Sequence, residues 1–266
     1  MAKSRVSDKT RYRQKRGTGR GKQYGPWIEV PDVSSIGRSH RVFWDKTERI
    51  HHFLSDIEEL FFWICIWDEK IIDIREQFPL LPQVNTLYIA ECFGYKHPAI
   101  PVKNQDIVMT TDFVITKLIE GREINFARSV KMTRDLLSTR TREKLAIERQ
   151  YWVDKDVDWA LVTENSFSLN MAKNIKRLSN IKEWVDGMNI DKTHLDKIYM
   201  TLMEENIEKI DAIFIATEMD KHHGYELGTF LNLVKYLIWT KQIVVDMKRE
   251  ILDYSNLRIL KGSRNG

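Results

Sequence analysis

Long apolar runs and cysteine are scarce in this chain of 266 residues. No stretch approaches the roughly 18 consecutive apolar residues that a transmembrane helix requires, and no apolar segment follows the basic N-terminus as it would in a secretory signal. The two cysteines, Cys65 and Cys92, lack the spacing of metal ligands, so we expect free thiols in a reducing compartment. These absences predict a cytoplasmic protein with no membrane partner.

Acidic residues are nearly absent from the first 25 positions. These positions hold nine Lys/Arg residues and a single acid, Asp8, for a net charge of +8, whereas the whole chain carries +4. A basic segment of this kind suits contact with a phosphate backbone, from which it displaces counterions. We therefore predict residues 1–25 to be a flexible DNA-binding arm, with a disordered solubilising tail as the alternative. The arm residues predicted to contact DNA are Arg11, Arg13, Lys15, Arg16, Arg20 and Lys22.

The rest of the chain has enough apolar residues for two domains, since 42% of all residues are hydrophobic and 11% are aromatic. In the first, predicted at residues 26–165, helices and strands alternate. Ser55 is a good helix N-cap, and Glu58 three residues later completes a capping box before a long apolar helix. Residues 71–78 then read as a strand that ends at Pro79.

Two β-like runs, residues 108–119 and 124–132, are separated by a turn that contains Gly121. A glycine at the first position of a two-residue loop favours a type II′ hairpin, and in that register Asp112 stands opposite Lys131. Because side chains alternate along a strand, both residues share one face, and the apolar residues share the other. We expect the first face to carry the chemistry and the second to be core.

From residue 166 the pattern becomes mostly helical. The predicted helices span residues 170–185, 194–207 and 225–239. Two short β-like runs follow, at 243–247 and 257–260. Helices that end in a β-ribbon are typical of a winged helix-turn-helix, so we predict a winged-helix domain at residues 166–266.

Hydrolysis of a phosphodiester needs a divalent cation, a water of lowered pKa and a positive charge that stabilises the transition state. Glu58, Asp112 and Lys131 are the predicted catalytic residues, and two carboxylates suit Mg²⁺, for which Mn²⁺ can substitute. The Ser129 hydroxyl and the Val130 carbonyl are further candidate metal ligands. Each catalytic candidate also has an ordinary interpretation, because Glu58 caps a helix, Asp112 can face solvent and Lys131 can pair with either.

Several stretches between residues 20 and 163 resemble, in order, the TnsA endonuclease subunit of heteromeric bacterial cut-and-paste transposons. The matching stretches are residues 37–41, 51–56, 73–82, 96–98, 111–113, 130–131 and 148–152. The resemblance implies an α/β fold with a restriction-endonuclease-like core followed by a winged-helix domain. It places the family's catalytic Glu, Asp and Lys on Glu58, Asp112 and Lys131, with Glu148 nearby. One position departs, because this chain has Ser129 where the family commonly has Gln.

The resemblance also implies partners. A protein of this family cuts the 5′ strands of transposon-end DNA, while a TnsB-like DDE transposase acts on the 3′ strands and a TnsC-like AAA+ ATPase binds the C-terminal region. It implies a bacterial, nucleoid-associated protein, and Arg38 and His40 in the first matching stretch join the predicted DNA contacts. Two alternatives stay open: a catalytically silent DNA-binding adaptor, which Ser129 favours, and a free-standing restriction or repair nuclease.

Overall fold

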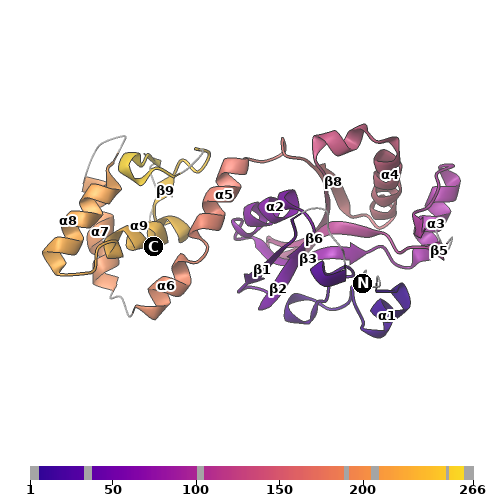
Figure 1. The fold of residues 1–266 in the computed structure, drawn as a ribbon, viewed down its shortest axis with the longest axis horizontal. Helices are drawn as coiled ribbons and strands as arrows, with labels where there is room; N and C mark the ends of the chain where they lie inside the picture. The colour runs from indigo at the N-terminus through magenta and orange to yellow at the C-terminus, as the bar shows by residue number, and fades with distance from the viewer. Residues whose placement is uncertain are drawn as a thin grey trace. The chain divides into compact units, whose positions relative to one another are not determined.

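Two units make up the structure, residues 1–167 and 168–266 (Figure 1). The structure is a computed structural model that describes residues 6–32, 38–100, 105–188, 192–204, 210–249 and 252–260. Within those ranges, no helix is both long and apolar enough to cross a membrane.

A four-stranded sheet lies at the centre of the first unit. Its strands, in hydrogen-bonded order, are β3 (Ile71–Pro79), β6 (Thr110–Ile119), β7 (Arg122–Val130) and β8 (Asp158–Val162). The first three are antiparallel, and β8 joins β7 in parallel after the crossover helix α4 (Thr139–Val153). The other helices and strands are α1 (Asp8–Arg13), β1 (His40–Trp44), β2 (Arg49–Phe53), α2 (Asp56–Ile66), α3 (Gln83–Cys92), β4 (Ala99–Ile100) and β5 (Gln105–Asp106). A parallel strand pair needs a crossover such as α4, and the unit is mixed α/β as predicted.

The β6–β7 hairpin is antiparallel as predicted, but its register differs. The loop is Glu120-Gly121 rather than Gly121-Arg122, and both of its residues have positive φ, 50° and 76°, as a type I′ turn requires. The register therefore moves by two positions and sets Asp112 opposite Ser129 rather than Lys131. A shift by an even number of residues leaves every side chain on its predicted face.

Both faces of this sheet are covered, which corrects the expectation of one open face. On one face Val114 packs beneath α3 and α4, in a core that includes Ile147 and Trp152. On the other face Phe113 packs against Phe53 of β2 and Phe61 of α2, with ring centroids 5.8 and 5.3 Å apart. The alternation was therefore correct, but the face predicted to carry only chemistry also carries core residues, because α4 crosses over it.

The N-terminal segment folds onto the sheet, so the prediction of a flexible arm is wrong for residues 6–25; residues 1–5 lie outside the described residues. Ser7 caps α1, and Tyr24 and Trp27 are buried, with 4% and 0% of their surface exposed. The Tyr24 hydroxyl donates to the carbonyl of Glu76 in β3 at 2.9 Å. Large aromatic side chains gain more from leaving water than from lying along DNA, and here they anchor the segment.

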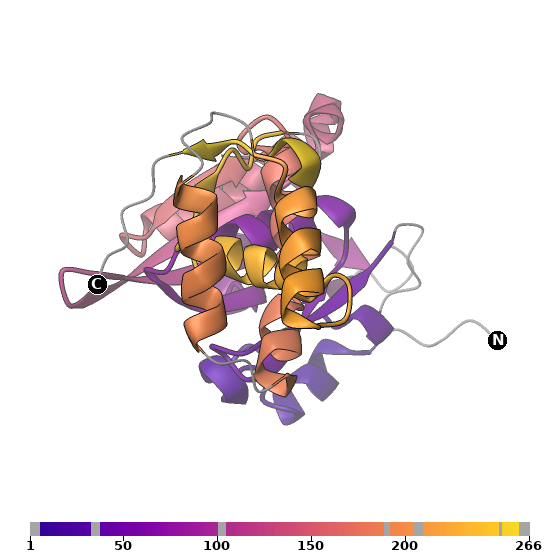
Figure 2. The same ribbon diagram turned by 90° about the vertical axis from the view of Figure 1, so that its left-hand side faces the viewer.

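The second unit is built around α9 (Thr229–Trp239). Its other elements are α5 (Leu169–Leu178), α6 (Ile181–Gly187), α7 (Lys192–Glu204), α8 (Ala212–His223) and the paired strands β9 (Val244–Val245) and β10 (Ile259–Leu260). Helix α9 packs against α5, α6, α7 and α8, and Figure 2 shows α7 and α8 in front of it. Its buried residues Phe230, Leu233, Val234 and Leu237 recur at helical spacing, as the sequence predicts.

Helix boundaries in this unit differ from the predicted ones. The predicted helix at 170–185 is divided into α5 and α6 at Ser179 and Asn180, and α8 is not predicted by the sequence pattern at all. The predicted helix at 225–239 begins only at Thr229, because Gly228 has a φ of 97°. The predicted end of the second helix, Ile207, lies outside the described residues. The β9–β10 pair follows α9 where a ribbon is expected, and the winged-helix assignment stays a prediction.

Candidate active site

Glu58, Asp112 and Lys131 lie together although they come from α2, β6 and the residue after β7. Lys131 Nζ lies 2.6 Å from Asp112 Oδ2, and the Val130 amide donates to the same oxygen at 2.7 Å. Asp112 is only 8% exposed. Lys131 reaches Asp112 as a diagonal neighbour across the hairpin, a separation that a long side chain spans. The two-residue error in register therefore did not separate the pair.

Glu58 reaches the site while it caps its own helix. The Ser55 hydroxyl accepts from the Glu58 amide at 3.4 Å and donates to Glu58 Oε1 at 2.8 Å, and the Leu54 amide donates to Glu58 Oε2 at 3.0 Å. The predicted N-cap at Ser55 is thus confirmed, whereas the reciprocal bond from the Glu58 side chain goes to the amide of Leu54 rather than that of Ser55. The capping and catalytic interpretations are compatible, because the cap fixes the carboxylate beside Asp112.

Gln77 of β3 joins the two carboxylates, and the sequence analysis did not single it out. Its Nε2 lies 3.4 Å from Glu58 Oε2 and 3.5 Å from Asp112 Oδ1, while its Oε1 accepts from the Thr110 hydroxyl at 3.2 Å. Gln77 is 3% exposed and has a φ of 47°, in the left-handed region that few non-glycine residues adopt. In the sequence it was a polar amide directly before the strand ends at Phe78 and Pro79, inside the matching stretch 73–82.

Glu148 and Ser129 form a separate buried pair behind Asp112. Glu148 Oε1 accepts from the Ser129 hydroxyl, from the Thr111 hydroxyl at 2.7 Å and from Trp159 Nε1 at 3.2 Å. Ser129 is fully buried, and its hydroxyl proton is engaged with Glu148. The Val130 carbonyl likewise accepts from Lys131 Nζ at 2.9 Å. Each of the two additional predicted metal ligands therefore has one hydrogen-bond partner within the folded chain, and their assignment as metal ligands stays a prediction.

Buried carboxylates dominate the electrostatics of this site. Burial and the charge of Asp112 raise the pKa of Glu58 to about 7, and the same two causes raise the pKa of Glu148 to about 7. Burial acts to lower the pKa of Lys131, but the Asp112 carboxylate outweighs it and the net shift is upward. Lys131 thus stays an ammonium ion at neutral pH, and a further positive charge near Glu58 and Asp112 would relieve their repulsion.

The donor set fits a divalent cation that prefers oxygen. Glu58 and Asp112 each place an oxygen within 3.5 Å of the same Gln77 nitrogen. Mg²⁺ typically takes one or two carboxylates and completes its octahedron with water and phosphate oxygens. In the part of the chain that the structure describes, no three His, Cys, Asp or Glu side chains are grouped so as to hold a metal alone. A cation here would therefore need water and substrate oxygens as well.

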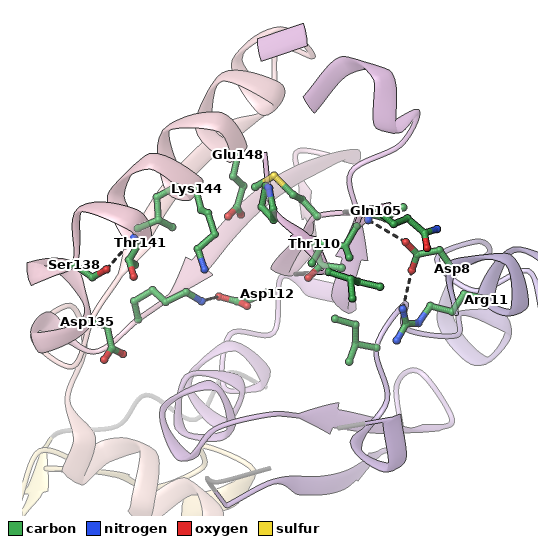
Figure 3. A pocket seen from close by; sticks show the side chains of 18 of the residues that line it. Asp8, Arg11, Gln105, Thr110, Asp112, Asp135, Ser138, Thr141, Lys144 and Glu148 are labelled. Atoms are coloured by element: carbon green, nitrogen blue, oxygen red, sulfur yellow. Dashed lines mark hydrogen bonds and ion pairs between the residues drawn. The ribbon is translucent and has the colours of Figure 1, made fainter. Parts of the chain in front are cut away.

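A cavity of about 800 Å³ opens beside this site (Figure 3). Asp112, Lys131, Lys144 and Glu148 line one end of it. Asp8 and Arg11 of the N-terminal segment line another part, and their ion pair is drawn in Figure 3. Apolar side chains and further polar ones make up the rest of the lining; the apolar ones are Val6, Ile28, Pro98, Ile100, Ile107, Val108, Met109 and Leu145. The N-terminal segment is therefore part of the wall of the site rather than a separate arm.

Two of the predicted DNA contacts are structural instead. Arg11 is buried and its Nη1 lies 2.8 Å from Asp8 Oδ1, and Arg16 forms an ion pair with Asp32. Nearby acids in the same folded segment satisfy these guanidinium groups, so the prediction that they bind DNA is not supported.

The remaining predicted DNA contacts lie closer to solvent. Arg20, Lys22 and His40 have acidic partners, which are Glu123 at 2.6 Å, Glu48 at 3.0 Å and Asp56 at 2.6 Å. Arg13, Lys15 and Arg38 are exposed and form no ion pair with any described residue. These three keep their charges available for a phosphate backbone.

Comparisons with known proteins agree on one family. The family model of the TnsA-like endonuclease N-terminal domain matches residues 68–164, and that of the TnsA endonuclease C-terminal domain matches residues 168–247. The transposon Tn7 transposition protein TnsA of Escherichia coli is 38% identical over 235 residues, which is 88% of this chain and 83% of that protein. Asp112 and Lys131 lie inside the first match, whereas Glu58 lies before it.

Proposed function

The chain belongs to the TnsA endonuclease family, and we propose that it cuts the 5′ strands at transposon ends by metal-dependent hydrolysis. One observation carries the proposal. The carboxylates of Glu58 and Asp112 both lie within 3.5 Å of the Gln77 side-chain amide nitrogen, and Lys131 Nζ lies 2.6 Å from Asp112. Family membership makes it an endonuclease of a Tn7-like transposition system. The proposal adds which DNA strand is cut and that the cleavage depends on a metal ion.

Glu58 and Asp112 would hold the Mg²⁺ or Mn²⁺ ion. When bound, such an ion supplies a water of lowered pKa and neutralises charge on the phosphate. Lys131 contacts Asp112, and its side chain stays positively charged at neutral pH because its pKa is raised. It can therefore neutralise the scissile phosphate or orient the attacking water. Gln77 keeps the two carboxylates side by side by donating to both. Glu148 lines the same end of the cavity as Asp112 and adds negative charge there, while it accepts hydrogen bonds from Thr111 and Ser129.

For the fold, we propose that residues 26–165 form a restriction-endonuclease-like core and residues 166–266 a winged-helix domain. An antiparallel β3–β6–β7 meander, extended by parallel β8 after helix α4, supports the first assignment. The β9–β10 pair after α9 supports the second. In the first domain the two catalytic carboxylates sit at the start of β6 and the first turn of α2, and the sheet fixes their separation.

We propose transposon-end DNA as substrate and two protein partners. A TnsB-like DDE transposase would process the 3′ strands, and a TnsC-like AAA+ ATPase would bind the C-terminal region. The family assignment supports both. Arg13, Lys15 and Arg38 are the exposed cations that we assign to the DNA backbone. A bacterial cytoplasmic protein associated with the nucleoid follows from this substrate.

Strand-resolved cleavage tests the proposed function. Duplex DNA carrying a transposon end is incubated with the chain and its partner proteins, in Mg²⁺, Mn²⁺ or EDTA, and each strand is mapped on a denaturing gel. We expect 5′-strand cleavage in either metal and none in EDTA, because the carboxylate pair cannot activate water by itself. An uncut 5′ strand beside a processed 3′ strand would indicate a silent adaptor. Cutting without the partners would indicate a free-standing nuclease.

A further inference from the structure

Lys144 extends from α4 toward the Asp112 end of the cavity (Figure 3). Its ammonium group forms no hydrogen bond or ion pair with any residue in the described ranges. It lies one helical turn before Glu148 and one turn after Thr141, and all three line the same cavity. One face of α4 is therefore turned toward the site, and Lys144 is the cation on that face.

The other cations that line the cavity already have acidic partners. Arg11 pairs with Asp8 at 2.8 Å, Lys131 with Asp112 at 2.6 Å, and Arg134 lies 3.9 Å from its neighbour Asp135. Arg140, on the same helix as Lys144, pairs with Glu143 at 2.9 Å. Among the described lining residues, Lys144 thus differs in having a charge that nothing in the folded chain neutralises.

The surroundings of Lys144 are electrostatically unfavourable for a cation. Partial burial and the positive charges of Arg140 and Lys131 lower the pKa of its ammonium group. Asp112 and Glu148 line the same cavity, but neither forms an ion pair with Lys144, so an anion bound at this place would neutralise its charge. A phosphodiester oxygen is the anion that a nuclease brings to this end of its cavity.

We propose that Lys144 binds a DNA phosphate next to the one that is cut, and so positions the strand over Asp112 and Lys131. The inference rests on the proposed nuclease function. It assigns Lys144 a positioning role through the substrate backbone, separate from Lys131, whose ammonium group is already bound to Asp112. Since a phosphate contact carries no sequence information, the effect of losing it is the same for every DNA sequence.

The test compares Lys144→Met, which removes the charge but keeps an apolar stem, with Lys144→Arg, which keeps the charge. Lys155→Met is the matched control, because Lys155 is exposed just after the end of α4 and its ammonium group lies 4.9 Å from the centroid of the Tyr151 ring. Binding of a fluorescent duplex is measured by anisotropy in EDTA over a series of salt concentrations. We expect Lys144→Met to reduce the slope of log K against log salt by about 0.9, the value for one lost phosphate contact.

Lys144→Arg and Lys155→Met should keep the wild-type slope, and thermal unfolding of all three variants should match the wild type. In strand-resolved cleavage with the partner proteins, Lys144→Met should raise KM more than it lowers kcat. Equal slopes and affinities for Lys144→Met and Lys155→Met, with normal 5′ cleavage by the wild type, would refute the phosphate contact of Lys144 and leave the nuclease function standing. A reduced slope together with an uncut 5′ strand in the wild type would uphold the phosphate contact and refute the nuclease function.

Discussion

Asp112→Asn should reduce 5′-strand cleavage by at least about a thousandfold, because losing the charge that we propose holds the catalytic metal would cost several kcal/mol, and each 1.36 kcal/mol is a factor of ten. Asp112 is the hub of the site: its Oδ2 accepts from Lys131 Nζ and the Val130 amide, and its Oδ1 faces Gln77. Asparagine has the same shape but no charge. The substitution therefore removes the charge proposed to bind the metal and leaves the packing of β6 in place.

The measurement is the initial rate of 5′-strand cleavage with partner proteins and Mg²⁺, compared with joining of the 3′ strands in the same reaction. Asp154→Asn is the control, since Asp154 is an exposed carboxylate at the end of α4 that accepts from Gln150 at 2.7 Å. The control should cut at the wild-type rate. Comparable 5′ cleavage by Asp112→Asn and Asp154→Asn would show that Asp112 is not a catalytic residue.

Glu76→Gln should lower the free energy of unfolding by about 3–5 kcal/mol, the usual cost of breaking a buried ion pair. Glu76 is 1% exposed and receives two hydrogen bonds from Arg49, at 2.8 and 2.6 Å, together with one from His51 Nδ1 at 2.9 Å. Burial alone would raise the pKa of Glu76, but His51 and Arg49 outweigh it and lower the pKa. Glutamine leaves the buried Arg49 guanidinium without a counter-charge.

Denaturant unfolding followed by tryptophan fluorescence measures this loss. The matched control is Glu123→Gln, which breaks the ion pair of Glu123 with Arg20, where both side chains are about half exposed. An exposed pair contributes at most about 1 kcal/mol, so the control should unfold close to the wild type. A Glu76→Gln variant as stable as the control would mean that the Arg49–Glu76 pair does not hold β2 against β3.

The hairpin shows what alternation can and cannot predict. Period-two alternation placed Asp112 and Lys131 on one face, and they do meet. The register depended on which two residues form the loop. Glu120 adopts a positive φ, which was expected only of Gly121, and the loop therefore begins one residue earlier than predicted. A two-residue error was harmless only because it was even; a shift by one would have moved Asp112 to the opposite face.

Gln77 was missed because its contribution depends on backbone geometry. Its neighbours follow from the β3–β6 register, in which the pairs Glu76 with Phe113 and Phe78 with Thr111 flank Gln77 and Asp112. From this position, where its φ is 47°, its amide reaches both Glu58 and Asp112. The sequence also could not show the partner of Ser129: packing of α4 brings Glu148 to its hydroxyl, and its role as a metal ligand stays a prediction.

The N-terminal segment shows the limit of reasoning from net charge. Nine basic residues predicted an arm along DNA, but Asp8 and Asp32 engage Arg11 and Arg16, and Trp27 is fully buried. A charge count cannot reveal which cations have an acid beside them in the fold. Tyr24 and Trp27 would have been the better signal, because large aromatic residues favour burial in a core.

The most direct test of the account is the position of bound Mn²⁺, located by anomalous scattering in a crystal of the full chain. The account predicts a peak in contact with the carboxylates of both Glu58 and Asp112, and loss of that peak in Asp112→Asn. A strong peak that contacts neither carboxylate, or one that persists unchanged in Asp112→Asn, would contradict the claim that this pair is the metal-binding centre of the nuclease.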